Sequence, residues 1–113
     1  MSELASQSLQ KVSKDTPPFN NDEIIPLIAS LPDWDCSIDQ KTLIREFRFK
    51  NFYQTIAFVN ALAWIANQAD HHPDLEVGYN RCQVRFSTHS TGGLSENDFI
   101  CGAKIDALLP ANS

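Results

Sequence analysis

Residues 51–73 read NFYQTIAFVNALAWIANQADHHP, and they predict the longest helix of the chain. Asn51 can cap a helix, with Gln54 at the reciprocal position of a capping box. Pro73 disfavours helical geometry at the residue before it, so we expect one long helix that ends there with two histidines at its C-terminus. Its apolar residues recur at helical spacing in two sets: Phe52, Ile56, Val59 and Ala63, then Phe58, Leu62, Ile65 and Ala69. An apolar arc this wide predicts packing on a sheet with one side and on a further surface, such as a second subunit, with the other.

Alternating apolar and polar residues on either side of this helix predict two β-hairpins. Upstream, residues 34–38 alternate, residues 39–41 supply a polar turn, and a second strand runs over residues 42–50. Downstream, apolar residues alternate from Leu75 to Tyr79 and again from Cys82 to Phe86. The second of these strands leads into Ser87, Thr88 and His89.

Two further helices complete the predicted domain. Asn20 and Glu23 form a capping box for a helix that runs to about Ser30, and Ser95 with Asp98 opens the last one. The order α-β-β-α-β-β-α predicts an α+β fold, a four-stranded antiparallel sheet with helices packed on one face. Residues 1–18 are polar and end in two prolines, so we expect a disordered lead-in before a domain over residues 19–110.

Length, charge and cysteine content narrow the function classes. The 113 residues fit one domain, and its net charge of −5 argues against binding to nucleic acid, which needs a basic surface. No apolar stretch is long enough to span a bilayer, and we expect no association with membranes. The start of the chain lacks a secretory signal, and Cys36, Cys82 and Cys101 are widely spaced without a CxxC pair. We therefore expect a cytoplasmic protein with reduced cysteines.

All three histidines of the chain are candidates for chemistry. Imidazoles exchange protons near neutral pH, so His71 and His72 at a helix end, with His89 at a strand end, could serve as acid and base. Two other interpretations remain open on spacing alone. A histidine pair beside a proline is often a solvated cap that binds the last carbonyls. Three histidines could also hold zinc, although neighbouring helical residues diverge by about 100° and rarely reach one ion.

Several segments together resemble the pterin-4a-carbinolamine dehydratases over about residues 19–109. The segments are Asp70-His71-His72-Pro73-Asp74, Tyr79-Asn80, Ser87-Thr88-His89, Gly93-Leu94-Ser95 with Asp98, and Glu46-Phe47-Arg48-Phe49-Lys50-Asn51-Phe52. Trp34 stands where the family has a tryptophan, although on its own it is more often a core aromatic. Two positions depart from the family. Asn67 replaces an ionisable residue one turn before the histidines, and Leu75 replaces a tryptophan.

The resemblance implies a dehydratase that converts 4a-hydroxytetrahydropterin to quinonoid dihydropterin and water in tetrahydrobiopterin recycling. It implies His71, His72 and His89 as catalytic residues and no metal or organic cofactor. The substrate-binding residues that it implies are Asp70, His71, His72, Ser87, Thr88, His89, Trp34 and Asn67.

The resemblance also implies partners. We expect a small-molecule pterin substrate, a homodimer or homotetramer, and a functional link to an aromatic amino acid hydroxylase. The alternative is a protein-interaction module. One animal relative serves as a dimerisation cofactor, and this chain could also have the fold without the activity and act as an assembly factor. The three intact histidines favour the enzyme.

Overall fold

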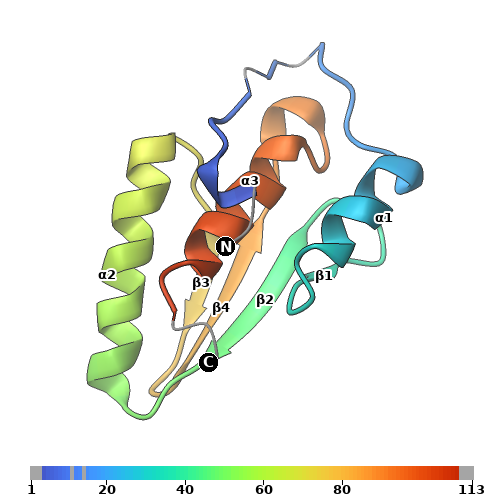
Figure 1. The fold of residues 1–113 in the computed structure, drawn as a ribbon. Helices are drawn as coiled ribbons and strands as arrows, with labels where there is room; N and C mark the ends of the chain where they lie inside the picture. The colour runs from blue at the N-terminus through green and yellow to red at the C-terminus, as the bar shows by residue number, and fades with distance from the viewer. Residues whose placement is uncertain (1–3, 11, 14, 110–113) are drawn as a thin grey trace.

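The computed structural model describes residues 4–10, 12–13 and 15–109, in which four antiparallel strands form one sheet (Figure 1). The strands are β1 (Asp35–Cys36), β2 (Leu43–Arg48), β3 (Asp74–Val77) and β4 (Arg81–Phe86), in the sheet order β1-β2-β4-β3. The register pairs Leu43 of β2 with Phe86 of β4, and Asp74 of β3 with Arg85 of β4. This pairing brings the start of β3 beside the end of β4.

Three α-helices accompany the sheet: α1 (Asn21–Ala29), α2 (Phe52–Ala69) and α3 (Glu96–Asp106). Figure 1 shows α2 and α3 lying across one face of the sheet, with α1 beside β1. The alternation in β4 matches this arrangement, because Cys82, Val84 and Phe86 are buried while the residues between them are partly exposed. The predicted α+β fold with helices on one face is confirmed.

The helices begin at the predicted caps. The side chain of Asn20 accepts a hydrogen bond from the N–H of Glu23, and the Glu23 carboxylate accepts one from the N–H of Asn20, both at 3.0 Å. At α2, Asn51 accepts from the N–H of Gln54 at 2.9 Å. The side chain of Gln54 accepts from Lys50 at 3.1 Å, one residue earlier than a standard capping box.

The core lies between the sheet and the helices and is rich in aromatic residues. Trp34 contacts both Phe47 and Phe86 at ring-centroid distances of 6.0 and 6.1 Å. Helix α2 buries Thr55, Phe58, Leu62 and Ala66. The other predicted stripe of α2 is less buried, and Phe52 is 51% exposed. Tyr53 and Trp64 of the same helix are 81% and 68% exposed, so α2 keeps an apolar surface outside the core.

Three local predictions differ from the structure. Ile38 lies in the loop between β1 and β2 and is fully exposed, because β1 contains only two residues. Helix α2 ends before Pro73, since Asp70 adopts the left-handed conformation with a φ of 51°, which aspartate tolerates better than most residues. Residues 4–10 lie against α3 where we expected a disordered lead-in: Leu4 is buried, and Lys104 donates a hydrogen bond to the carbonyl of Ala5 at 2.7 Å.

Among the helices that the structure describes, none has the length and apolar character needed to cross a membrane.

Candidate active site

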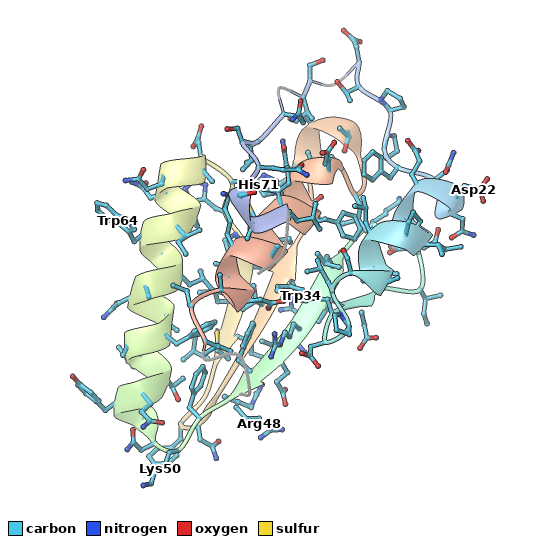
Figure 2. All side chains as sticks on the ribbon, viewed as in Figure 1. Asp22, Trp34, Arg48, Lys50, Trp64 and His71 are labelled. Carbon is cyan, nitrogen blue, oxygen red and sulfur yellow. The ribbon has the colours of Figure 1, made fainter. Side chains whose placement is uncertain are left out.

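The three histidines line one pocket, at the place where α2 ends and β4 ends. The pocket has a volume of about 630 Å³, within the usual range for a small-molecule site. Of the predicted site residues it brings together Asp70, His71, His72, Ser87, Thr88 and His89. His71 is labelled in Figure 2, and Leu9 and Gln10 of the N-terminal segment line the same pocket.

Sheet register explains why segments about 18 residues apart in sequence meet here. The pair between Asp74 and Arg85 places the residues just before β3 opposite those just after β4. The left-handed Asp70 turns the chain out of α2, and the N–H of His71 closes the helix on the carbonyl of Ala66 at 3.1 Å. The histidine pair and the Ser87-Thr88-His89 segment therefore face each other across one end of the sheet.

His71 is held by the buried carboxylate of Asp98. Its Nε2 lies 2.6 Å from Oδ1 of Asp98, whose side chain is fully buried, while the His71 side chain is 12% exposed. The ring also stacks on Phe86, with centroids 5.7 Å apart and planes 7° from parallel. These two contacts fix both the position and the plane of the imidazole.

The second oxygen of Asp98 is occupied by other donors. Its Oδ2 accepts hydrogen bonds from the Thr88 hydroxyl at 2.7 Å and from the N–H of Ser95 at 2.9 Å. The Ser95 hydroxyl, 2.7 Å from that of Thr88, must then donate to it. A carboxylate with these donors is a pure acceptor, so Nε2 of His71 carries a hydrogen and Nδ1 is the nitrogen left for a ligand.

Thr88 holds the carboxylate of Asp98 and has little hydrogen-bonding capacity left for a ligand. Its N–H donates to the carbonyl of Gly93 at 3.2 Å, and its own carbonyl accepts from both the N–H and the hydroxyl of Thr91. With its hydroxyl bound to Asp98, every polar group of Thr88 has a partner. His72 and His89, by contrast, are exposed at the mouth of the pocket.

Two predicted site residues lie elsewhere. Trp34 is 2% exposed in the core, and its indole N–H donates to the carboxylate of Asp106 at 2.9 Å. Asn67 is exposed on α2 and does not line the pocket. The structure thus places Trp34 as a core residue and Asn67 outside the site.

Asp98 is the site residue whose role sequence reasoning missed. Its position three residues after Ser95 indicated only a capping box, and the structure confirms that the N–H of Ser95 is one of its donors. The contact with His71 spans 27 residues, and no local spacing signals it. Within the described residues, no group of three or more His, Cys, Asp and Glu side chains is arranged to hold a metal ion.

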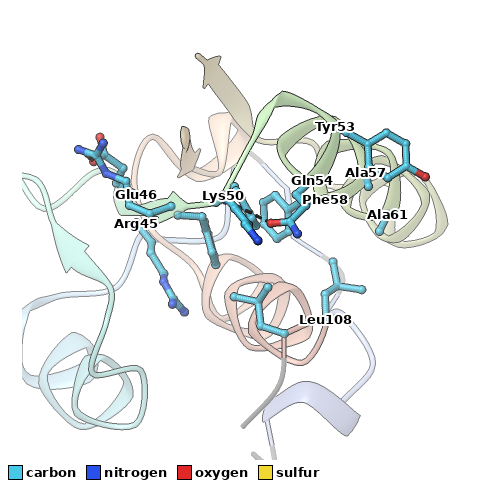
Figure 3. A pocket seen from close by; sticks show the side chains of 13 residues that line it. Arg45, Glu46, Lys50, Tyr53, Gln54, Ala57, Phe58, Ala61 and Leu108 are labelled. Atoms are coloured by element: carbon cyan, nitrogen blue, oxygen red, sulfur yellow. Dashed lines mark hydrogen bonds and ion pairs between the residues drawn. The ribbon is translucent and has the colours of Figure 1, made fainter. Parts of the chain in front are cut away.

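A larger groove lies between β2, α2 and the residues after α3 (Figure 3). Its volume is about 860 Å³, and its lining includes Lys50, Tyr53, Phe58 and Leu108. None of the three histidines lines it, and its surface is mainly apolar. The smaller pocket is the better candidate for chemistry, because it holds the candidate acids and bases.

Comparison of the sequence with known proteins identifies close relatives. The sequence model of the family described as pterin 4 alpha carbinolamine dehydratase matches residues 17–108. A Nitrosospira multiformis protein assigned to the pterin-4-alpha-carbinolamine dehydratases is 52% identical over 107 residues, covering 95% of this chain and 93% of its own. One from Stenotrophomonas maltophilia with the same assignment is 63% identical over 82 residues, covering 73% and 71%.

Two solved structures share the fold. A transcriptional coactivator/pterin dehydratase from Brucella melitensis superposes with a TM-score of 0.78 at 29% identity, covering 82% of this chain and 99% of its own. A pterin dehydratase-like protein described as a RuBisCO assembly factor in the alpha-carboxysome gives a TM-score of 0.59 at 25% identity, covering 67% and 88%.

Proposed function

This chain belongs to the pterin 4 alpha carbinolamine dehydratase family, and we propose that it removes water from a 4a-hydroxytetrahydropterin by histidine acid–base catalysis. The observation that carries the proposal is the His71–Asp98 pair, 2.6 Å apart, in a pocket shared with His72 and His89. A buried carboxylate that orients an imidazole toward a pocket is a recurrent arrangement for proton transfer.

The reaction needs one proton delivered and one removed. The bond between C4a and the hydroxyl oxygen breaks, the N5 proton leaves, and a double bond forms between C4a and N5, which gives quinonoid dihydropterin and water. We assign His71 as the acid that protonates the departing hydroxyl through Nδ1. The carboxylate of Asp98 faces the positive charge that the ring carries while both of its nitrogens are protonated.

The remaining pocket residues have supporting roles in this proposal. His72 and His89, both exposed, bind the substrate and relay the N5 proton to solvent. Asp70 accepts hydrogen bonds from the aminopyrimidine edge, and the main chain of Ser87 meets its other polar atoms. Thr88, whose polar groups are engaged, contributes by holding Asp98.

The test is a pair of variants at His71. His71→Ala and His71→Gln should each lower kcat by about 100-fold or more, the lower range for a general acid–base group. His71→Gln keeps a polar side chain of similar reach, so it separates the loss of proton transfer from the loss of packing. Dehydration by both variants at the wild-type rate would refute the assignment.

We further propose that the dehydratase acts in tetrahydrobiopterin recycling, in the cytoplasm, on the product of an aromatic amino acid hydroxylase. We propose a homodimer or homotetramer, supported by the exposed Tyr53 and Trp64 on α2. Sedimentation should then give a mass of at least two chains, and Trp64→Ser should lower it.

A protein-interaction role is the second candidate, favoured by the coactivator and assembly-factor descriptions of the two solved relatives. The exposed aromatic residues of α2 are the surface that it would use. Tyr53→Ser with Trp64→Ser distinguishes the two functions: loss of a protein partner with kcat intact favours binding.

A further inference from the structure

The N-terminal residues contribute one side of the histidine pocket. Leu9, Gln10 and Val12 line it together with His71, His72 and His89. Figure 1 shows this segment in blue lying against α3 and then rising past the end of α2. We name residues 4–10 and 12–13 the N-terminal wall, and we propose that it selects among pterins by contact with the substituent at ring position 6. This inference rests on the proposed dehydratase function.

The wall is attached to α3 at two points by specific hydrogen bonds. Asn97, 4% exposed, accepts from the N–H of Gln10 at 2.6 Å and donates to the carbonyl of Gln10 at 2.8 Å. Lys104, two turns along the same helix, donates to the carbonyl of Ala5 at 2.7 Å. Both attachments use the main chain of the wall, so they hold its path and leave the side chains of Leu9 and Val12 to line the pocket.

The hydrogen bonds between Asn97 and the wall lie next to the His71–Asp98 pair. Asn97 directly precedes Asp98, the partner of His71, on the first turn of α3. Leu9 packs against the hydrophobic core as well as lining the pocket. The wall therefore lines the same pocket as the imidazole that we assign as the acid.

The chemistry of these side chains indicates what part of the substrate they contact. Leu9, Gln10 and Val12 carry no titratable group, so they cannot supply the protons of the reaction. The polar edge of a pterin needs hydrogen-bonding partners, whereas C6 is bonded to N5, one of the reacting atoms. A substituent on C6 must therefore leave the reacting centre along a surface beside the histidines, and Leu9 and Val12 supply the apolar part of that surface.

The wall precedes the residues that the family model matches. The family model begins to match at residue 17, after every residue of the wall. A contact made by this segment can thus set a substrate preference without altering the catalytic residues, which lie within the part that the model matches.

The test compares two substrates in full-length variants. A phenylalanine hydroxylase supplies the carbinolamines of tetrahydrobiopterin, which carries a dihydroxypropyl group at C6, and of 6-methyltetrahydropterin. The Leu9→Ala/Val12→Ala double variant removes the apolar contact, and Ser8→Ala is the matched control, because Ser8 is an exposed neighbour outside the pocket. Lys104→Met removes one hydrogen bond to the wall from a position outside the pocket. It provides a second, independent test in case the double variant unfolds locally.

We expect the ratio of kcat/KM for the two carbinolamines to change by about tenfold in the double variant, the lower range for discrimination by an apolar contact. The change should come from KM of the biopterin substrate, with kcat within twofold of wild type. Lys104→Met should move the ratio in the same direction and Ser8→Ala should leave it unchanged. A ratio within twofold of wild type in both the double variant and Lys104→Met overturns the proposal.

Failure of the underlying function would look different. If wild type accelerates the decay of neither carbinolamine, the dehydratase function is refuted. The proposal for the wall is then tested by the ratio of the affinities for 7,8-dihydrobiopterin and 6-methyl-7,8-dihydropterin. This ratio should change by about tenfold in the double variant, and a ratio within twofold of wild type overturns the proposal.

Discussion

Replacement of Asp98 by asparagine tests the geometry of the site most finely. In the protein the two carboxylate oxygens accept from His71, Thr88 and Ser95 at 2.6 to 2.9 Å. An asparagine carbonyl can still accept from Thr88 and Ser95, which leaves the amide nitrogen facing Nε2 of His71. An NH₂ group only donates, so the imidazole would have to accept at Nε2 and carry its hydrogen on Nδ1. An NH₂ group facing Nε2 would therefore oppose protonation of both ring nitrogens, which is the form in which His71 serves as the acid.

The expected magnitude follows from the role of the pair. Loss of correctly oriented acid–base catalysis costs at least about 100-fold in kcat, which corresponds to about 2.7 kcal/mol in the activation free energy. The hydrogen bond between His71 and a charged partner is worth about 1.5–3 kcal/mol, so the free energy of unfolding should fall by a similar amount. KM should change little, because Asp98 is fully buried beneath the ring.

The assay and its control use the same helix. Carbinolamine decay, followed in the ultraviolet, gives kcat and KM, and urea unfolding gives stability. Asp106→Asn is the matched control, because Asp106 is a hydrogen-bonded carboxylate on α3 that does not line the histidine pocket. It should keep kcat within twofold. An Asp98→Asn protein with wild-type kcat would refute the idea that the carboxylate supports the doubly protonated His71 ring.

Three further outcomes follow from the core. Trp34→Phe keeps an aromatic ring but loses the hydrogen bond to Asp106, so the free energy of unfolding should drop by about 1–3 kcal/mol with kcat unchanged. A large rise in KM would instead indicate that Trp34 contacts the substrate. Burial raises the pKa of Cys82 to about 11 and of Cys101 to about 12. At pH 8 both thiols should resist a disulfide reagent until urea unfolds the protein, and reaction of either in the native state would contradict their burial. Burial also raises the pKa of Asp106, although the hydrogen bond from Trp34 and the charge of Arg45 oppose this shift. Just above pH 4, the native state therefore holds more protons than the unfolded state. The contribution of Asp106 to the free energy of unfolding falls as pH rises through that window. The urea midpoint of Asp106→Asn minus that of wild type should therefore increase from pH 3.5 to pH 7. A constant difference would contradict the raised pKa.

Local signals in the sequence were sufficient for the elements of this fold. Asn20 with Glu23, and Asn51 with Gln54, mark helix starts through contacts within one turn, so spacing alone reveals them. The end of α2 was harder to place, because Pro73 was visible while the left-handed geometry of Asp70 was not. Ile38 shows the limit of alternation, since an apolar residue in a turn imitates a strand.

The site was only partly predictable, because its organising contacts are long-range. The resemblance to the family indicated that the three histidines share one site, and the structure places them in one pocket with Ser87. The pairing of His71 with Asp98 depends on how α3 crosses the sheet, which spacing does not encode. Trp34 could have been core or ligand platform, and only packing against Phe47 and Phe86 decides for the core. The attachment of Gln10 to Asn97 spans 87 residues and was invisible for the same reason.

The decay of a carbinolamine in the presence of the wild-type protein tests the dehydratase function itself. A phenylalanine hydroxylase generates 4a-hydroxytetrahydropterin, and its ultraviolet absorbance is followed with and without the chain. We predict decay that accelerates in proportion to protein concentration with wild type and is at least about 100-fold slower per molecule with His71→Ala. Decay at the spontaneous rate with the wild-type protein would refute the dehydratase function.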